Sequence, residues 1–341
     1  MAVKKTEIHF SGKQVTYYFD ADFSYLEKIA PKEKTFIITD ENVYAAHLQK
    51  FEGWKVIVIK AGEQYKQQST VDDIIRQLIE SEAGRSSFIV GVGGGVITDM
   101  AGYAASVYMR GLKFGFVPAT ILGMVDASIG GKNGVDVGAY KNLVGTIRQP
   151  DFLLFDYSLL DTLPKDQWIN GFSEVIKHAC IKDAAMFDLL EENDIEKFQS
   201  NKSLLAALIE RNVSIKTKVV VEDEFEKGDR KLLNFGHTLG HAIENIYELP
   251  HGHAVSVGMI VASDISVAIN DFDPAQKERI KQLIEKYQLT SALSFDKEKV
   301  WNLLKMDKKR VSNEMNFILL SKIGEAVVKP IPLQQLENLI N

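Results

Sequence analysis

The sequence predicts an α/β domain followed by a mostly α-helical domain. Two observations carry this prediction. Short β-branched runs alternate with helical patterns in the first half of the chain, whereas long helical patterns dominate after about residue 165. The length of 341 residues agrees, because a domain commonly contains on the order of 100–200 residues. We place the boundary near residues 163–164, which gives domains 1–163 and 164–341.

The first half is expected to contain five short strands, at residues 34–39, 55–59, 87–91, 114–118 and 152–156. Residues 69–81 form an amphipathic helical pattern, since Val71, Ile74 and Leu78 recur at helical spacing. A further helix is expected over 96–108. Repetition of strand, helix and strand favours parallel pairing through right-handed crossovers, so a parallel sheet is predicted.

The second half is expected to be helical over 172–193, 201–222, 232–248, 254–270 and 274–287. A short apolar run at residues 316–320 predicts a strand or a hairpin near the end of the chain. Residues 130–145 are rich in glycine and polar side chains, which favours a functional loop over a linker.

The composition excludes several classes of protein. The formal net charge is −6, so a general nucleic-acid or acidic-membrane binder is not expected. A single cysteine cannot form an internal disulfide. The sequence shows neither an uninterrupted run of about 18 apolar residues nor a signal peptide at its start. These features predict a cytoplasmic protein without a membrane partner.

Glycines follow the third predicted strand and precede a predicted helix, in the stretch GVGGGVITD at 91–99. Small residues let a ligand approach the backbone, and the N–H groups at the helix start can hold a pyrophosphate. The spacing departs from the GxGxxG dinucleotide fingerprint. Phosphate binding is favoured, although a turn that serves only strand–helix packing remains an alternative.

Four of the seven histidines fall in one short window: His237, His241, His251 and His253. His237 and His241 are four residues apart on a predicted helix, so their rings point the same way. Such a pair is a usual arrangement for a first-row metal, and a carboxylate could complete the site. The spacing favours this pair but leaves the third ligand open, and the candidate carboxylates are Glu174, Glu244 and Asp264.

Cationic side chains beside these motifs are the third signal. In an acidic protein they suggest a pocket for a phosphate or a carboxylate, although each one alone is more simply a solvated surface residue. The residues are Arg110, Lys132, Lys141 with its neighbour Asn142, Lys177, Lys216, Arg230 and Lys308.

Six stretches, taken together, resemble the 3-dehydroquinate synthases, a family of sugar-phosphate cyclases. They are GVGGGVITDMAGYAASVYMRG, VPATILGMVDASIGGKNGVDV, YKNLVG, GFSEVIKHA, LLNFGHTLGHAIE and HGHAVSVGM. The resemblance covers roughly residues 39–309. It implies a Rossmann-like nucleotide-binding α/β domain at the N-terminus and a mostly α-helical, metal-binding domain at the C-terminus.

The resemblance implies NAD and one divalent metal, zinc or cobalt, as cofactors. It assigns the metal to Glu174, His237 and His253, and so moves His241 to the substrate side. The implied NAD-binding residues are Asp40, Asn42, Glu63, Lys66, Gly94, Gly95, Asp99, Thr120, Lys132, Lys141 and Thr162.

The resemblance also implies a substrate-binding set: Arg110, Asp126, Lys132, Lys141, Asn142, Lys177, Lys216, Arg230, Asn234, His241 and Lys308. Catalytic roles are implied for Lys132, Asn142, Lys177, Lys216, Glu226 and His241.

The implied reaction converts 3-deoxy-D-arabino-heptulosonate 7-phosphate to 3-dehydroquinate with loss of phosphate, in the shikimate pathway of aromatic amino acid biosynthesis. NAD would be reduced and reoxidised within each turnover. The alternatives are another sugar-phosphate cyclase, a metal-dependent NAD polyol dehydrogenase and an inactive NAD- and metal-binding protein. The expected partners are the sugar-acid phosphate and a second copy of the chain in a homodimer.

Overall fold

The computed structural model describes residues 3–138, 140–308 and 313–340, without the side chains of 305–308. The chain forms two compact units. The first consists of Met1–Gln167 and Lys202–Glu224, and the second of Trp168–Asn201 and Phe225–Asn341. This division differs from the two consecutive domains expected from the sequence, because one long helix from the second half belongs to the first unit.

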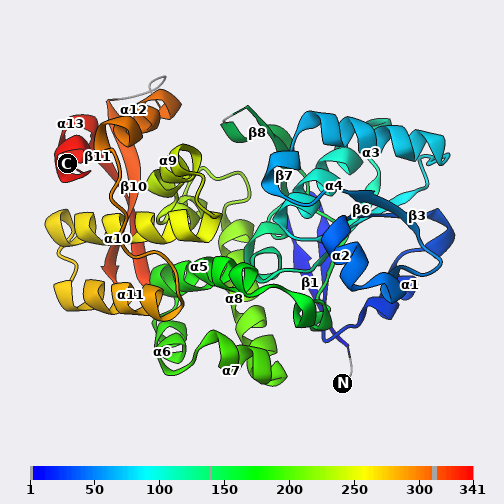
Figure 1. Ribbon diagram of the computed structural model, residues 1–341, viewed down its shortest axis with the longest axis horizontal. Coiled ribbons are helices and arrows are strands. Elements are labelled where there is room, and N and C mark those ends of the chain that lie inside the picture. The colour runs from blue at the N-terminus through cyan, green and yellow to red at the C-terminus, as the bar shows by residue number, and fades with distance from the viewer. Residues whose placement is uncertain (1–2, 139, 309–312, 341) are drawn as a thin grey trace. The chain divides into compact units, whose positions relative to one another are not determined.

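Among the described residues, the first unit is built on a seven-stranded sheet: β1 (Lys4–His9), β2 (Gln14–Phe19), β3 (Thr35–Asp40), β4 (Lys55–Ile59), β5 (Phe88–Gly93), β6 (Lys113–Pro118) and β9 (Phe152–Leu154). The strand order is β1–β2–β9–β6–β5–β3–β4. Figure 1 labels β1, β3 and β6 of this sheet. Within this sheet, β1 and β2 pair antiparallel, and all the other neighbouring strands pair parallel. The predicted α/β class is therefore confirmed, and all five predicted strands are present.

The strand order reverses beside β3. After β3 the chain adds β4 on one side, and it then returns to place β5 on the other. In an open parallel sheet, ligands bind beyond the carboxyl ends of the strands at such a reversal. Asp40 ends β3 and the glycine cluster ends β5, so both predicted cofactor segments lie at this point.

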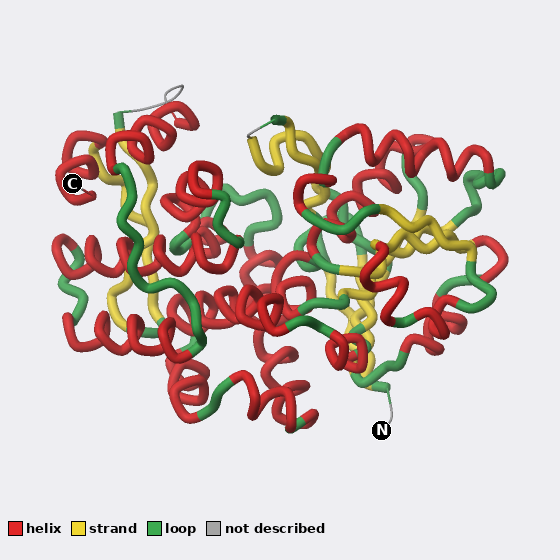
Figure 2. Tube along the Cα trace, viewed as in Figure 1, coloured by secondary structure: helices red, strands yellow, loops and turns green. Residues whose placement is uncertain are grey.

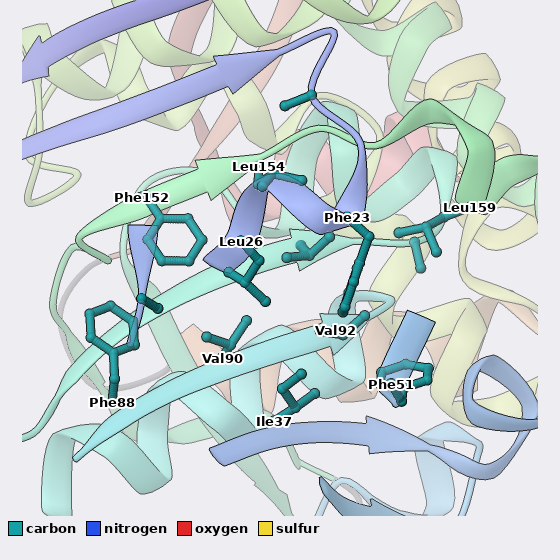
Figure 3. Packing of buried hydrophobic residues seen from close by; sticks show 14 residues of the cluster. Phe23, Leu26, Ile37, Phe51, Phe88, Val90, Val92, Phe152, Leu154 and Leu159 are labelled. Atoms are coloured by element: carbon teal, nitrogen blue, oxygen red, sulfur yellow. The ribbon is translucent and has the colours of Figure 1, made fainter. Parts of the chain in front are cut away.

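Helices connect the strands of the first unit: α1 (Leu26–Ile29), α2 (Glu41–Ala46), α3 (Gln68–Glu80) and α4 (Gly95–Val107). A hydrophobic core lies on the sheet, and Figure 3 shows Phe88 and Phe152 beside Val90 and Leu154 within it. The rings of Phe88 and Phe152 stack with centroids 5.7 Å apart. This stacking joins the first residues of β5 and β9, at the opposite end of β5 from the glycine cluster.

Residues 130–145 do not form the loop expected from their composition. Most of them belong to an antiparallel hairpin of β7 (Lys132–Val137) and β8 (Tyr140–Ile147). Gly134 and Gly145 face each other in this hairpin, and a Cβ on Gly145 would lie 2.0 Å from the Asn133 carbonyl oxygen. The glycines therefore permit close backbone pairing rather than disorder.

The long helix α8 (Lys202–Glu222) packs within the first unit. Lys216 contacts Asp126, and the Thr217 hydroxyl donates to the Tyr17 hydroxyl at 3.4 Å. Leu205, Leu208 and Val213 of this helix are buried. These contacts join distant parts of the chain, which the sequence pattern of a single helix does not reveal.

The second unit is mostly helical, as predicted, and Figure 2 shows its helices gathered around one pair of strands. The strands β10 (Glu314–Lys322) and β11 (Glu325–Pro332) form an antiparallel hairpin, which confirms the strand expected at 316–320. The helices are α5 (Lys165–Lys182), α6 (Ala184–Glu192), α7 (Ile195–Ser200), α9 (His237–Tyr247), α10 (His251–Ile269), α11 (Pro274–Lys286), α12 (Lys297–Lys308) and α13 (Leu333–Ile340).

Two predicted helices are divided in the structure. The helix expected over 172–193 breaks at Asp183, whose carboxylate accepts the Met186 N–H and caps α6. The helix expected over 232–248 begins only at His237. The preceding residue, Gly236, has φ +78°, and a Cβ there would lie 2.7 Å from the Val255 carbonyl oxygen. Only glycine fits this left-handed, tightly packed position.

Helix α10 is long and apolar enough to cross a membrane by length and composition, with a mean hydropathy of 1.5. Such a segment is not expected from the sequence, because serine and glycine interrupt its apolar runs. Within the protein, 61% of this stretch is buried, which is also the pattern of a core helix. The helix packs on α9 and on β10.

Candidate functional site

The glycine cluster forms a cradle at the end of β5. Gly94 precedes the first turn of α4, and among the described residues no side chain caps that turn. A Cβ on Gly94 would lie 3.1 Å from Thr120 Cγ2, and one on Gly93 would lie 2.6 Å from Ile97. Any larger residue would therefore fill the cradle. Backbone N–H groups at an uncapped helix start suit the pyrophosphate of a dinucleotide.

Other predicted cofactor residues lie near the strand ends of the same unit. Asp40 accepts the backbone N–H groups of Asn42 and Val43 at 3.0 and 2.9 Å, and burial raises the pKa of its carboxyl. The Thr120 hydroxyl accepts the Gly123 N–H at 2.9 Å. The Thr162 hydroxyl lies 2.8 Å from Nε2 of His47.

A polar cluster surrounds Lys66, which is 5% exposed. Its Nζ lies 2.7 Å from Asp99 Oδ2 on α4, and it donates to Asn142 Oδ1 at 2.6 Å. Lys141 lies 3.7 Å from Glu63 in the same region. Burial alone would lower the pKa of Lys66, but the charges of Asp99 and Glu63 outweigh it and raise the pKa. The ammonium therefore stays charged beside the cofactor helix.

Among the predicted substrate residues of the first unit, one lysine is buried and two other cationic residues are exposed. Lys216, which is buried, donates to the Asp126 carbonyl oxygen at 2.6 Å and lies 2.8 Å from its carboxylate. Arg110, in the turn after α4, and Lys132, at the start of β7, are exposed. The unit thus offers both a fixed ion pair and accessible cations for an anionic ligand.

In the second unit, Glu174, His237 and His251 converge. Glu174 is fully buried on α5, and its Oε1 lies 3.3 Å from Nε2 of each histidine. The donor atoms of the three residues lie within 4.8 Å of one another. One divalent ion about 2.0–2.2 Å from each atom would satisfy this spacing. Two imidazoles and a carboxylate are also a usual donor set for a catalytic zinc site.

Outer contacts orient both imidazoles. Nδ1 of His237 lies 3.2 Å from the Phe235 carbonyl oxygen, and Nδ1 of His251 lies 3.5 Å from Glu244 Oε2. Each Nε2 is thereby directed toward Glu174. Metal-binding histidines commonly use their second nitrogen in this way, which fixes the tautomer and the ring orientation.

Charges in this group favour an ionised carboxylate. Burial alone would raise the pKa of Glu174, but Lys177 and the histidines hold the pKa well below its usual range. Lys177 is itself buried and forms an ion pair with Glu174 one helical turn away. Burial would lower the pKa of His251, but the two carboxylates of Glu174 and Glu244 raise the pKa to about 9.

The structure corrects the third histidine of the expected metal set. His253 does not belong to the group; its Nδ1 lies 2.9 Å from the Thr290 hydroxyl instead. Residues two apart on a helix point about 200° apart, so His251 and His253 of α10 cannot face the same ligand. His251 takes the place that the resemblance gave to His253. Burial lowers the pKa of His253.

The other early candidates for the metal lie outside the Glu174 group. His241 is exposed, and its ring centroid lies 5.2 Å from that of His237. Its donor atoms approach Glu244 and His251 instead. Asp264 pairs with Lys277 on the surface. The pair of histidines four residues apart is therefore split between two neighbouring groups.

Three of the remaining predicted residues lie in or near the 3₁₀ turn Asp229–Asn234, before α9, and the fourth lies on α12. The Asn234 amide donates to Glu226 Oε1 at 2.7 Å, and Arg230 is buried. Lys308 ends α12, and its side chain lies outside the described residues.

Sequence reasoning named His251 and Glu244 only among the open metal candidates, and it missed Asp136. Asp136 accepts the Asn142 backbone N–H at 2.7 Å. The i, i+2 spacing of His251 and His253 is a signal that only one of them can face the metal, because residues two apart on a helix point in different directions. No comparable local signal marks Asp136.

Comparisons with known proteins agree with this geometry. Residues 56–170 match the family described as "3-dehydroquinate synthase N-terminal", and 171–310 match "3-dehydroquinate synthase C-terminal". A 3-dehydroquinate synthase of Campylobacter concisus is 38% identical over 333 residues, which cover 95% of each chain.

Two solved structures share the whole fold. A 2-deoxy-scyllo-inosose synthase, complexed with carbaglucose-6-phosphate, NAD⁺ and Co²⁺, has a TM-score of 0.84 and 26% identity and covers 99% of both chains. The 2-epi-5-epi-valiolone synthase ValA of Streptomyces hygroscopicus, with NAD⁺ and Zn²⁺ bound, has a TM-score of 0.87 and 25% identity. That match covers 100% of this chain and 97% of ValA.

The fold that the chain shares with these two synthases, together with the glycine cradle and the Glu–His–His group, defines its class as the sugar-phosphate cyclases. Within this class, the chain belongs to the 3-dehydroquinate synthase family.

Proposed function

We propose that the protein converts 3-deoxy-D-arabino-heptulosonate 7-phosphate to 3-dehydroquinate and phosphate, a step of the shikimate pathway. The observation that carries this proposal is the 38% identity to a 3-dehydroquinate synthase over 95% of the chain. Neither another sugar-phosphate cyclase nor a polyol dehydrogenase is favoured, since the solved cyclases are only 25–26% identical and a solved glycerol dehydrogenase only 15% identical.

We assign the metal to Glu174, His237 and His251. The short distances between their donor atoms, and the outer contacts of both imidazoles, support this assignment. Three protein ligands leave further coordination positions for substrate oxygens, as a catalytic site requires. Lys177 neutralises the buried Glu174 and keeps a positive charge beside it.

We assign NAD to the cradle at Gly94 and Gly95 and to the strand ends around it. The absence of a capping side chain on the first turn of α4, within the described residues, leaves backbone donors for the pyrophosphate. Asp40 offers a carboxylate at the end of the neighbouring strand, the type of group that accepts a hydrogen bond from a ribose hydroxyl. Lys66 and Asp99 hold their ion pair one turn into α4.

When bound, NAD supplies reversible hydride transfer and the metal supplies Lewis acidity toward substrate oxygens. The side chains bind and orient the substrate. Its phosphate and carboxylate require cations, and the first unit offers exposed Arg110 and Lys132, while the second offers buried Arg230. Lys216 lies 2.8 Å from the Asp126 carboxylate. His241 is an exposed imidazole, and we assign it to the substrate side.

The remaining assignments concern partners and location. We propose a homodimer in the cytoplasm, without a nucleic-acid or membrane partner, on the basis of the resemblance and the net charge of −6. Light scattering at several protein concentrations tests the dimer. A mass equal to one chain at every concentration would exclude it.

The activity is tested by measuring phosphate release from 3-deoxy-D-arabino-heptulosonate 7-phosphate with zinc-loaded protein and trace NAD, while NADH absorbance is followed. We expect phosphate in many-fold excess over NAD, without accumulation of NADH. Accumulation of NADH from a simple polyol, without phosphate release, would instead assign the protein to the dehydrogenases.

A further inference from the structure

We infer that Asp136 is a positioning residue that holds Lys141 and Asn142, at the start of β8, in their substrate-binding conformation. The inference rests on the proposed function, which gives Lys141 and Asn142 their roles. Asp136 lies near the end of β7, two residues before the hairpin turn, and it belongs to none of the site sets that the resemblance implies.

The contacts of Asp136 connect three segments of the first unit. Its backbone N–H donates to the Lys66 carbonyl oxygen at 2.8 Å, which anchors β7 to the cofactor-side segment. Its Oδ1 accepts the Asn142 backbone N–H at 2.7 Å. The pairing of β7 with β8 is irregular between Val135 and Val137, so the normal strand ladder is interrupted at Asp136. Its side chain thus supplies a bond that the interrupted ladder lacks.

Asn142 adopts an uncommon backbone conformation. Its φ is +53°, in the left-handed region, which asparagine enters more readily than most residues with a side chain. Residues held in this conformation persist where the surroundings determine them, and they cluster at functional sites. Asn142 is held on both sides: Asp136 accepts its N–H, and Lys66 donates to its side-chain oxygen at 2.6 Å.

Apolar packing contributes little to the start of β8. Tyr140 is 51% exposed and Leu143 is 66% exposed, so the side chains flanking Lys141 and Asn142 are largely solvated. Besides the pairing of β8 with β7, polar contacts to Asp136, Lys66 and Glu63 hold this segment. Loss of one such contact should loosen the start of β8 without disturbing the hydrophobic core.

A role in stability alone would also explain the hydrogen bonds of Asp136. The experiment therefore compares effects on stability with effects on substrate binding. The variants are Asp136→Ala, which removes the acceptor, and Asp136→Asn, which keeps a carbonyl oxygen in its place. Asp73→Ala is the matched control, since Asp73 pairs with Arg76 on the surface of α3. The readouts are hydrogen exchange of the Asn142 amide in the NAD- and zinc-loaded protein, the substrate KM, the NAD Kd and the melting temperature.

We expect Asp136→Ala to speed exchange at the Asn142 amide and to raise KM, each by roughly tenfold, the loss that one hydrogen bond would cause. The NAD Kd should rise as well, because Lys141 also belongs to the implied NAD-binding set, whereas the melting temperature should stay near wild type. Asp136→Asn should recover most of these effects, and Asp73→Ala should show none of them.

Unchanged exchange at the Asn142 amide in Asp136→Ala would overturn the inference. An equal rise in KM for the Ala and Asn variants, or a rise that only follows a lower melting temperature, would do the same. Exchange can be measured without turnover. If the wild type proved inactive on the proposed substrate, the proposed function would fail, and the exchange data would still test whether Asp136 holds the Asn142 backbone.

Discussion

At His251 and His253, a separation of two residues decides which imidazole can reach Glu174. The first lies 3.3 Å from the carboxylate, whereas the second contacts Thr290. Both side chains are half-buried and both lie in the first turn of α10, so they form a natural pair for comparison. Their different directions along one helix give the metal assignment its sharpest test.

We expect His251→Ala to lower zinc affinity by more than about 100-fold, because even an outer contact of a metal ligand is worth 10–100-fold. His253→Ala should retain zinc at close to one ion per chain. Zinc content after dialysis against a weak chelator, measured by mass spectrometry, distinguishes the two. Retention of zinc by His251→Ala together with loss by His253→Ala would reverse the assignment.

At the scale of elements, the β5–α4 junction combines three requirements in one short segment. The strand must end, the helix must begin without a side-chain cap, and a ligand must approach the backbone. Glycine meets all three. The space beside Gly94 is already bounded by Thr120, which would lie 3.1 Å from a methyl carbon at that position. A methyl group would therefore compete with both the neighbouring threonine and the cofactor.

Gly94→Ala is expected to weaken NAD binding by at least about tenfold, equivalent to about 1.4 kcal/mol. Zinc binding in the other unit should not change. Gly12→Ala is the control, since nothing lies within 4 Å of its Cβ position. Titration of NAD by calorimetry checks the result, and equal affinities for the two variants would contradict a cofactor role for the cradle.

Local patterns predict elements well where one face or one run is strongly apolar. The strands β3 and β4 follow from β-branched runs, and β5, β6 and β9 follow from short apolar runs. Helix α3 follows from its buried stripe of Val71, Ile74 and Leu78. The hairpin of β7 and β8 escapes such a prediction because most residues of β8 are exposed, so no apolar alternation marks it. Helix α12 escapes it as well, and its first turn is charged.

The candidate site is predictable as far as residue types and motifs allow. Glu174 and His237, which the resemblance places at the metal, lie 3.3 Å apart in the structure. The choice between His251 and His253 depends on where α10 begins, and helix boundaries are the least certain part of such a prediction. Contacts such as Asp136 with Asn142 depend on a strand irregularity, which a single sequence does not encode locally.

At the scale of the whole molecule, each cofactor is assigned to a different unit. A ligand that binds only the folded state stabilises it by about 2.7 kcal/mol at 100 times its Kd. We expect zinc to protect the second unit and NAD the first. Hydrogen exchange with each ligand alone should show protection confined to the corresponding segments.

The matched variant for this prediction is His237→Ala. It should lose the zinc effect and keep the NAD effect. Protection spread evenly over both units by zinc alone would contradict the assignment of separate sites.

The position of α8 has a consequence for synthesis on the ribosome. The first unit contains Met1–Gln167, but it is complete only when Lys202–Glu224 has also emerged. Translation at about 5–20 residues per second makes that delay roughly 3–11 s. During this interval the first unit of the nascent chain lacks α8. Residues Trp168–Asn201 have then emerged before Phe225–Asn341, the rest of the second unit. Stalling in this window should leave a nascent chain sensitive to protease, and release beyond Glu224 should be the point at which the first unit becomes resistant.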